Sequence, residues 1–354
     1  MKRKGNVYEG IYTIENLREA EKIARRGKKK QYGVKLFDKD PEGNLLKLQE
    51  MLANKTYRTS PYSIRTIYDP KEREIYCLPY FPDRIAQHAA MLKIKPDLIA
   101  AFTADSYSCI EGKGIHGFDK NLKKVLKKDV PGTKYCLKID VKKFYPSISH
   151  PILKRQIRRK WKDPDLLNFL DEIINSAPGV PIGNYVSQFF ANFYLTGFDH
   201  WLKENKRVKY YFRYADDIVI LASNKPELHQ LLADMRVYLD EHLKLTIKSN
   251  YQIFPVAKRG IDVCGYVYFH THVMLRKKIK QNFARMLKKR KNDKSIAAYK
   301  GWAVHGNCKH LLKKILPDDK RFWTTRHNNR REKFHGTKLN EKRDTKQENK
   351  SACI

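Results

Sequence analysis

Two adjacent acids lie between two β-rich runs in the middle of the chain. Residues 210–214 (YYFRY) precede them, residues 218–221 (IVIL) follow, and Asp216 and Asp217 stand at the junction. Aromatic and β-branched runs favour strands, so this pattern predicts a hairpin with the two carboxylates at its tip. Two like charges beside apolar strands are costly unless a cation offsets them. The chain must therefore fold so that a positive group, most directly a divalent cation, reaches this tip.

A third acid, Asp140, ends another predicted strand. Residues 135–140 (YCLKID) alternate between apolar and polar positions and follow the turn pair Pro131-Gly132. Magnesium takes a few carboxylates and completes its shell with water and substrate phosphates. Two such ions, about 3.5–4 Å apart, serve in-line phosphoryl transfer. On these grounds alone polymerases, nucleases and cyclases all remain open.

The charge balance indicates a polyanionic partner. The 354 residues include 73 Lys and Arg against 38 Asp and Glu, a net charge of +35. Nucleic acid and an acidic membrane surface are the two alternatives. No apolar run is long enough to span a bilayer, and the basic start of the chain lacks the apolar stretch of a secretion signal. We therefore expect a nucleic-acid partner, no membrane and a cytoplasmic location.

The cysteines argue against a zinc ribbon and against a disulfide framework, because they are scattered singly with no C-x-x-C pair. We expect most of them to be small buried hydrophobic residues. They are Cys77, Cys109, Cys136, Cys264, Cys308 and Cys353.

Helical and strand patterns alternate from about residue 130, which favours an α+β fold. Before that point a helix is expected over 15–26, and the basic run 25–30 fits a solvated loop and a nucleic-acid contact equally well. Residues 276–314 are helical in pattern and dense in Lys and Arg, with Met286 and Leu287 on the expected buried face. The later elements expected are helices over 187–205 and 227–243, and strands near 245–247 and 263–269.

The motifs resemble those of reverse transcriptases. Residues 137–145 (LKIDVKKFY), followed by 212–217 (FRYADD), are similar to the family's two metal-binding motifs. The resemblance implies that Asp140, Asp216 and Asp217 hold two Mg²⁺ ions, which Mn²⁺ could replace, in an RNA-directed DNA polymerase. Further matches follow in order over about 70–315: two fingers motifs at 73–91 and 107–116, the segment that offers a lysine near the triphosphate at 243–248, and the primer grip at 260–275.

The resemblance also implies roles around the incoming nucleotide. Tyr145 falls where an aromatic ring excludes a ribose 2′-hydroxyl. Many relatives place an arginine against the triphosphate where this chain has Ile110 and Glu111, so we expect Lys113 to make that contact. The expected nucleotide-binding residues are Arg84, Lys113, Tyr145, Ile182, Gly183, Gln188 and Lys248, and the expected primer grip is Gly265 with Tyr266.

The segment 180–188 (VPIGNYVSQ) indicates the subfamily. Viral and group II intron enzymes usually have Gln before the glycine and Pro after the serine, whereas this chain has Ile182 and Gln188. These residues, and Tyr299 to Trp302 with Asn307, are similar to the enzymes of diversity-generating retroelements. That similarity implies misincorporation opposite template adenines, because an aliphatic residue loses a polar contact near the nascent base pair. It also implies a small basic accessory protein.

The expected architecture is a right hand with fingers, palm and a helical thumb. The expected divisions are a basic N-terminal extension (1–70), fingers and palm (71–275), the thumb (276–316) and a disordered basic tail (317–354). The partners implied are template RNA, primer–cDNA duplex and dNTPs. The alternatives are a retron, group II-like or phage-defence reverse transcriptase and, in a different class, a catalytically inactive RNA-binding protein.

Overall fold

The computed structural model describes residues 3–68, 72–288, 293–308 and 310–312. The chain divides into two compact units, Met1–Thr271 and His272–Ile354. The expected tail and the last part of the expected thumb lie outside the described residues. Within the described ranges, no helix combines the length and the apolar character that crossing a membrane requires.

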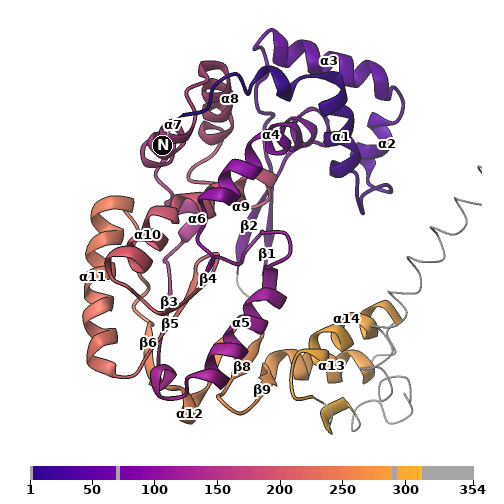
Figure 1. Ribbon diagram of the computed structural model, residues 1–354. Coiled ribbons are helices and arrows are strands. Elements are labelled where there is room, and N and C mark those ends of the chain that lie inside the picture. Colours follow the sequence, from indigo (N-terminus) through magenta and orange to yellow (C-terminus); the bar gives the residue numbers. More distant parts are fainter. Residues whose placement is uncertain (1–2, 69–71, 289–292, 309, 313–354) are drawn as a thin grey trace, which may run out of the picture. The chain divides into compact units, whose positions relative to one another are not determined.

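An antiparallel sheet of four strands forms the centre of the first unit (Figure 1). β3 (Tyr135–Asp140) lies between β5 (Asp217–Ala222) and β6 (Gln252–Pro255), and β4 (Tyr210–Tyr214) lies beyond β5. The strand predicted over 135–140 and the hairpin predicted around the two acids are both present. Because β3 and β5 are antiparallel, the end of β3 meets the start of β5 at one edge of the sheet.

One predicted strand of this sheet is wrong. Residues 245–247 form only an isolated bridge, Val141 to Ile247, and the fourth strand is β6 instead. The backbone still follows β3 for a short distance, because the Lys248 N–H donates to the Asp140 carbonyl at 2.9 Å. The chain then turns away at residues 249–250 before it returns as β6.

Helices cover the sheet, and one of them differs from its prediction. α11 (Lys225–Leu243) contacts β3, β5 and β6, and it matches the predicted helix. The single helix expected over 187–205 is three consecutive segments: α9 (Tyr185–Tyr194), α10 (Thr196–His200) and a π-helical turn. At the first break the Thr196 hydroxyl donates to the Asn192 carbonyl at 3.3 Å, a bond that bends helices.

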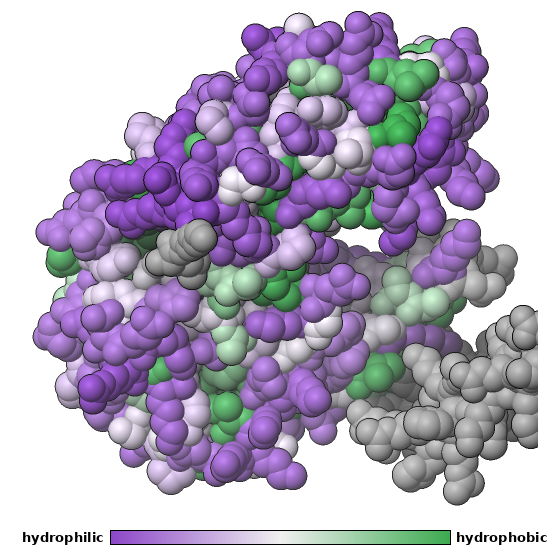
Figure 2. All heavy atoms as spheres, turned by 45° about the horizontal axis from the view of Figure 1, so that its top comes forward, coloured by the Kyte–Doolittle hydropathy of each residue, from purple (hydrophilic) through white to green (hydrophobic). Residues whose placement is uncertain are grey.

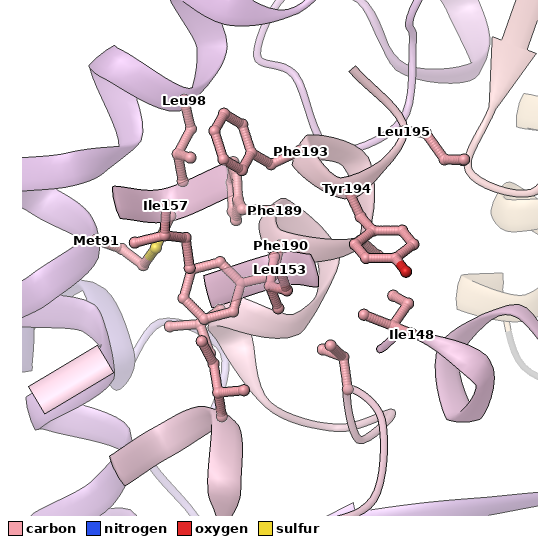
Figure 3. Close-up of a cluster of buried hydrophobic side chains, with 14 of the residues drawn as sticks. Met91, Leu98, Ile148, Leu153, Ile157, Phe189, Phe190, Phe193, Tyr194 and Leu195 are labelled. Atoms are coloured by element: carbon pink, nitrogen blue, oxygen red, sulfur yellow. The ribbon is translucent and has the colours of Figure 1, made fainter. Parts of the chain in front are cut away.

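A core of large apolar side chains lies between α4 (Ile85–Ala101), α7 (His150–Lys160) and α9. Figure 3 shows Met91 and Leu98 of α4 on one side of this core and the aromatic residues of α9 beside them. Leu153 and Ile157 of α7 are buried in the same cluster. The core fixes α9, and with it the loop before α9 that carries the expected nucleotide-binding residues.

The N-terminal helices belong to the first unit. α1 (Ile14–Ala24) packs on α4, and the Asn16 amide donates to the Ala89 carbonyl at 3.1 Å. The other elements of this unit are α2 (Tyr32–Phe37), α3 (Pro41–Ala53), β1 (Ser63–Ile67), β2 (Arg73–Cys77), α5 (Gly114–Lys128), α6 (Phe144–Ser147), α8 (Pro164–Asn175), α12 (Val256–Arg259), β7 (Ile261–Val263) and β8 (Tyr266–Tyr268).

The second unit contains β9 (Val273–Leu275) and two helices, α13 (Lys277–Lys288) and α14 (Asp293–Val304). The rings of Phe283 and Tyr299 stack between the helices with centroids 5.0 Å apart. Met286 is buried, whereas Leu287 is half-buried. The basic segment expected to be helical over 276–314 is therefore helical in α13 and α14, whereas residues 305–308 form a turn outside any helix.

Candidate active site

Asp140 and Asp217 lie directly opposite each other on neighbouring strands. Asp140 is the last residue of β3, Asp217 is the first residue of β5, and the two are paired in antiparallel register. Opposite residues of such a pair have Cβ atoms about 4.5–5.5 Å apart and share one face of the sheet. Asp216 belongs to the two-residue turn that joins β4 to β5. Three acids from two distant segments therefore meet at one edge of the sheet.

The turn presents Asp216 to the other two acids. Ala215, its first residue, has a φ of 55°, in the left-handed region that side chains rarely adopt. Burial, then the charge of Asp140, then that of Asp217, raises the pKa of Asp216 to about 6. The raised pKa reflects burial first and then repulsion by the other two carboxylates, and a bound cation would offset both.

The Asp140 carboxylate has one oxygen satisfied and one not. The Lys248 ammonium donates to Oδ2, while Oδ1 is buried without a hydrogen-bond partner. Among the described residues no three His, Cys, Asp or Glu side chains are gathered closely enough to form a complete metal site. The donors nevertheless fit Mg²⁺, because a buried carboxylate oxygen needs a partner and magnesium takes only a few protein carboxylates.

Arg213 is fully buried beside the acidic turn, and it is not among the site residues expected from the sequence. Its guanidinium pairs with Asp199 of α10, with Nη2–Oδ2 at 2.5 Å and Nε–Oδ1 at 2.8 Å. Asp199 also accepts hydrogen bonds from Tyr211 at 2.6 Å and Ser106 at 3.0 Å. Nη1 of Arg213 donates to the Ala215 carbonyl at 3.2 Å. This network ties the acidic turn to the interior.

Lys113 does not extend toward the acids. Its ammonium donates to the carbonyls of Ala104 at 3.0 Å and Ser106 at 3.2 Å, and burial lowers its pKa. Ile110 is buried, and the Glu111 side chain is 92% exposed. A triphosphate contact by Lys113 requires the ammonium to leave these carbonyls, so this role stays a prediction.

Arg84 lies in a group of basic side chains. It ends the π-helical turn Tyr80–Arg84 and is half-buried. Burial, then the charges of Lys28 and Arg84, lowers the pKa of His88 to about 4. Lys28 comes from the basic run 25–30, which the sequence left open between a loop and a nucleic-acid contact. Like charges this close to one another favour an anionic ligand over further cations.

The loop with Ile182 and Gly183 lies against β2. The Ile182 carbonyl accepts a hydrogen bond from the Tyr76 N–H at 2.7 Å. Gly183 has a φ of 129°, and a Cβ there would lie 2.1 Å from the Tyr76 carbonyl oxygen. Only glycine fits this close approach. The loop therefore holds the half-buried Ile182 at a fixed register beside the β1–β2 hairpin.

Tyr145 and Gln188 both lie near Cys109. Burial, with smaller contributions from Cys109 and Asp216, raises the pKa of Tyr145, so this ring lies near the acidic turn. The exposed Gln188 accepts a hydrogen bond from the Cys109 thiol, with Sγ–Oε1 at 2.9 Å. Cys109 itself is only partly buried, as are Cys77 and Cys264, so the expectation of mostly buried cysteines holds only for Cys136 and Cys308 among the described residues.

Gly265 and Tyr266, the expected primer grip, belong to the β7–β8 hairpin. Cys264 and Gly265 form its turn with φ values of 49° and 87°, as a type I′ turn requires. The Tyr266 side chain is only 2% exposed. A ring this deeply buried is not exposed to a primer, so the primer-grip role of these two residues stays a prediction.

A family model described as "Reverse transcriptase (RNA-dependent DNA polymerase)" matches residues 69–260, more than half of the chain. No curated protein matches. Among solved structures, apo telomerase from Candida tropicalis is 12% identical over 65% of this chain and 52% of its own, with a TM-score of 0.49. Telomerase from Candida albicans, in complex with a TWJ fragment of telomeric RNA, is 11% identical over 66% and 51%, with a TM-score of 0.45. This chain thus spans about half the length of those chains.

Proposed function

The chain belongs to the reverse transcriptase family, and on that basis we propose that it copies an RNA template into complementary DNA at the site formed by Asp140, Asp216 and Asp217. The observation that supports this site best is the pairing of Asp140 with Asp217, together with the unpartnered Oδ1 of Asp140. The three acids would hold two Mg²⁺ ions. When bound, these ions activate the primer 3′-hydroxyl and stabilise the leaving pyrophosphate.

The surrounding residues position the substrates. Lys248 pairs with Asp140, and its ammonium would turn from that carboxylate to the triphosphate of the incoming dNTP. The ring of Tyr145 lies near Asp216, where it would exclude a ribose 2′-hydroxyl. Arg213 holds the turn that carries Asp216. We also propose α13 and α14 as the helices of a thumb that binds primer–template duplex, and a cytoplasmic location, where RNA and dNTPs are present.

The change Asp216→Asn tests the site. We expect it to abolish magnesium-dependent primer extension on an RNA template and to leave folding intact, because it removes one of three mutually repelling charges. Thermal unfolding and single-nucleotide extension are the measurements. The control is Asp240→Asn on the exposed side of α11, which should extend primers like the original chain. Measurable extension by the folded Asp216→Asn variant would refute the assignment.

We further propose that copying is error-prone at template adenines, as in diversity-generating retroelements, with a small basic accessory protein as partner. Support comes from Ile182, whose aliphatic side chain the Gly183 loop holds beside Tyr76. A glutamine there could hydrogen-bond near the nascent base pair, whereas isoleucine discriminates mainly by shape.

Sequencing of cDNA made on a defined RNA tests this fidelity proposal. We expect errors concentrated opposite template adenines, and we expect Ile182→Gln to lower them several-fold while errors opposite the other three bases change little. The other three template bases serve as internal controls. Equal error frequencies at all four bases would contradict the proposal and leave the polymerase assignment untouched.

A further inference from the structure

A basic pocket lies on the outside of α7, on elements that carry none of the proposed catalytic residues. It has a volume of about 660 Å³ and is open to solvent. Strongly hydrophilic side chains gather at the upper left of Figure 2, on the side where Figure 1 places α7. Six residues line the pocket. One is Pro151, and the other five are cationic: Arg3, Lys154, Arg155, Arg158 and Arg159.

The spacing of these residues along α7 places them on one side of the helix. Lys154 and Arg158 are four residues apart, and so are Arg155 and Arg159, which makes each pair neighbours on the helix surface. Leu153 and Ile157 point the other way into the core. α7 contains no acid, so repulsion within these pairs is not offset along the helix itself.

α8 fixes two of the four α7 cations that line the pocket. Arg158 donates to both oxygens of Asp171, at 3.1 and 2.6 Å. Lys154 donates to Asn175 at 2.8 Å and lies 3.6 Å from the same Asp171 carboxylate. One carboxylate therefore serves two cations, and the pocket keeps an excess of positive charge.

Arg155 and Arg159 supply that excess. Both are exposed, and within the part of the chain that the structure describes neither forms an ion pair. Their guanidinium groups are therefore available to an anion. An arginine offers up to five N–H donors in a planar fork, which suits phosphate oxygens.

The N-terminal backbone completes the pocket. The Lys4 N–H donates to the Lys160 carbonyl at 3.0 Å, and the Lys162 N–H donates to the Lys4 carbonyl at 2.7 Å. These bonds flank Trp161, which is fully buried, and they hold Arg3 beside α7. Main-chain hydrogen bonds of the neighbouring Lys4 therefore hold Arg3, the fifth cation, in a fixed position beside α7.

We propose that this pocket binds the phosphodiester backbone of the template RNA outside the active site. The proposal rests on the proposed function, which supplies the RNA. The pocket has several cations and no aromatic side chain, which suits phosphate contacts and not stacking or reading of bases. It also lacks the apolar side chains by which a protein surface inserts into a membrane.

The double change Arg155→Ala/Arg159→Ala in the full chain tests the proposal. One ligand is a long template RNA, and the other is a short primer–template duplex that only fills the active site. We expect several-fold weaker binding of the long RNA. The log–log salt slope should fall in magnitude by roughly 1.4 to 1.8, since each phosphate contact contributes about 0.7 to 0.9. Extension of the short duplex should be unchanged.

Two controls accompany this test. Lys35→Ala/Lys47→Ala removes two exposed charges from α2 and α3 and should bind the long RNA like the original chain. Arg155→Lys/Arg159→Lys keeps both charges and should keep most of the affinity and the full salt slope.

The outcomes separate this proposal from the proposed function. Unchanged binding of the long RNA by the double alanine variant overturns the proposal that this pocket binds RNA. So does a loss confined to binding of acidic phospholipid vesicles, which would assign the pocket to a membrane surface. Failure of the original chain to extend the short duplex in magnesium instead overturns the polymerase assignment, because that substrate does not involve the pocket.

Discussion

Arg213 ties the turn that follows β4 to the interior of the protein. The ion pair with Asp199 is completely buried, and both partners also hydrogen-bond to neutral groups. Removing one partner of such a pair is more destabilising than removing both, because it leaves an uncompensated buried charge. Since the Ala215 carbonyl is one of the groups that Arg213 holds, the pair acts on the turn that carries Asp216.

We expect Arg213→Met to lower the free energy of unfolding by about 3–5 kcal/mol, because Asp199 then stays buried without its partner. Asp199→Leu/Arg213→Met should recover a large part of that stability. Primer extension should stay low in both, since the Ala215 carbonyl has lost its donor. Urea unfolding and the turnover number are the measurements.

The control for this pair is Arg26→Met at an exposed arginine just after α1, which should change stability by no more than about 0.5 kcal/mol. Full recovery of primer extension by the double variant would show that the ion pair serves stability alone.

Among the residues of the site, the acids could be predicted from the sequence, whereas the residues that hold them in place could not. Asp216 and Asp217 stand out because charge interrupts an apolar run, which is a local signal. Arg213 interrupts the same run, but its partner Asp199 is 14 residues away on another element. A buried ion pair depends on where two elements meet, and one sequence does not show that. The carbonyl contacts of Lys113 depend on loop geometry and were missed for the same reason.

The loop before α9 and the β1–β2 hairpin form one structural element through Gly183. The loop carbonyl of Ile182 bonds to Tyr76 of β2, and the glycine lets the two backbones approach. The position of the hairpin and that of the loop are therefore coupled, and a side chain at residue 183 must separate them.

We expect Gly183→Ala to destabilise the protein by about 1–3 kcal/mol, because a Cβ meets the Tyr76 oxygen and φ is 129°. Thermal unfolding measures this. Extension at limiting dNTP should fall further than stability alone explains, since the loop carries expected nucleotide-binding residues. Gly301→Ala in α14, where nothing lies within 4 Å, is the matched control and should be neutral or slightly stabilising. Equal behaviour of the two variants would contradict the coupling.

Elements with a strong local sequence pattern could be predicted, whereas features set by single contacts between segments could not. α11 and β3 have strong local patterns and match their predicted ranges within a few residues. The strand predicted at residues 245–247 was wrong because the chain turns away at residues 249–250. The segment therefore pairs with the chain after β3 only through one isolated bridge. The break in the helix at Leu195 depends on one threonine hydroxyl bond, which periodicity does not report.

At the scale of the whole molecule, positive charge is present in both units. The net charge of +35 makes association with nucleic acid long-ranged and dependent on salt. In the second unit, α13 has no acid in its first turn, and Phe283 and Met286 are buried. The lysines at the start of this helix therefore lie on a side that a phosphate backbone can reach.

The proposed thumb and the α7 pocket differ in whether they affect binding of the short primer–template duplex. We expect Lys277→Ala/Lys280→Ala to weaken binding of the short primer–template duplex and to reduce its salt slope by roughly 1.8, because two duplex phosphate contacts are lost. Turnover at saturating duplex should be unchanged, since the three acids are in the first unit. Lys35→Ala/Lys47→Ala controls for the charge removed. An unchanged slope would exclude these lysines from the duplex, because every lost phosphate contact must appear in it.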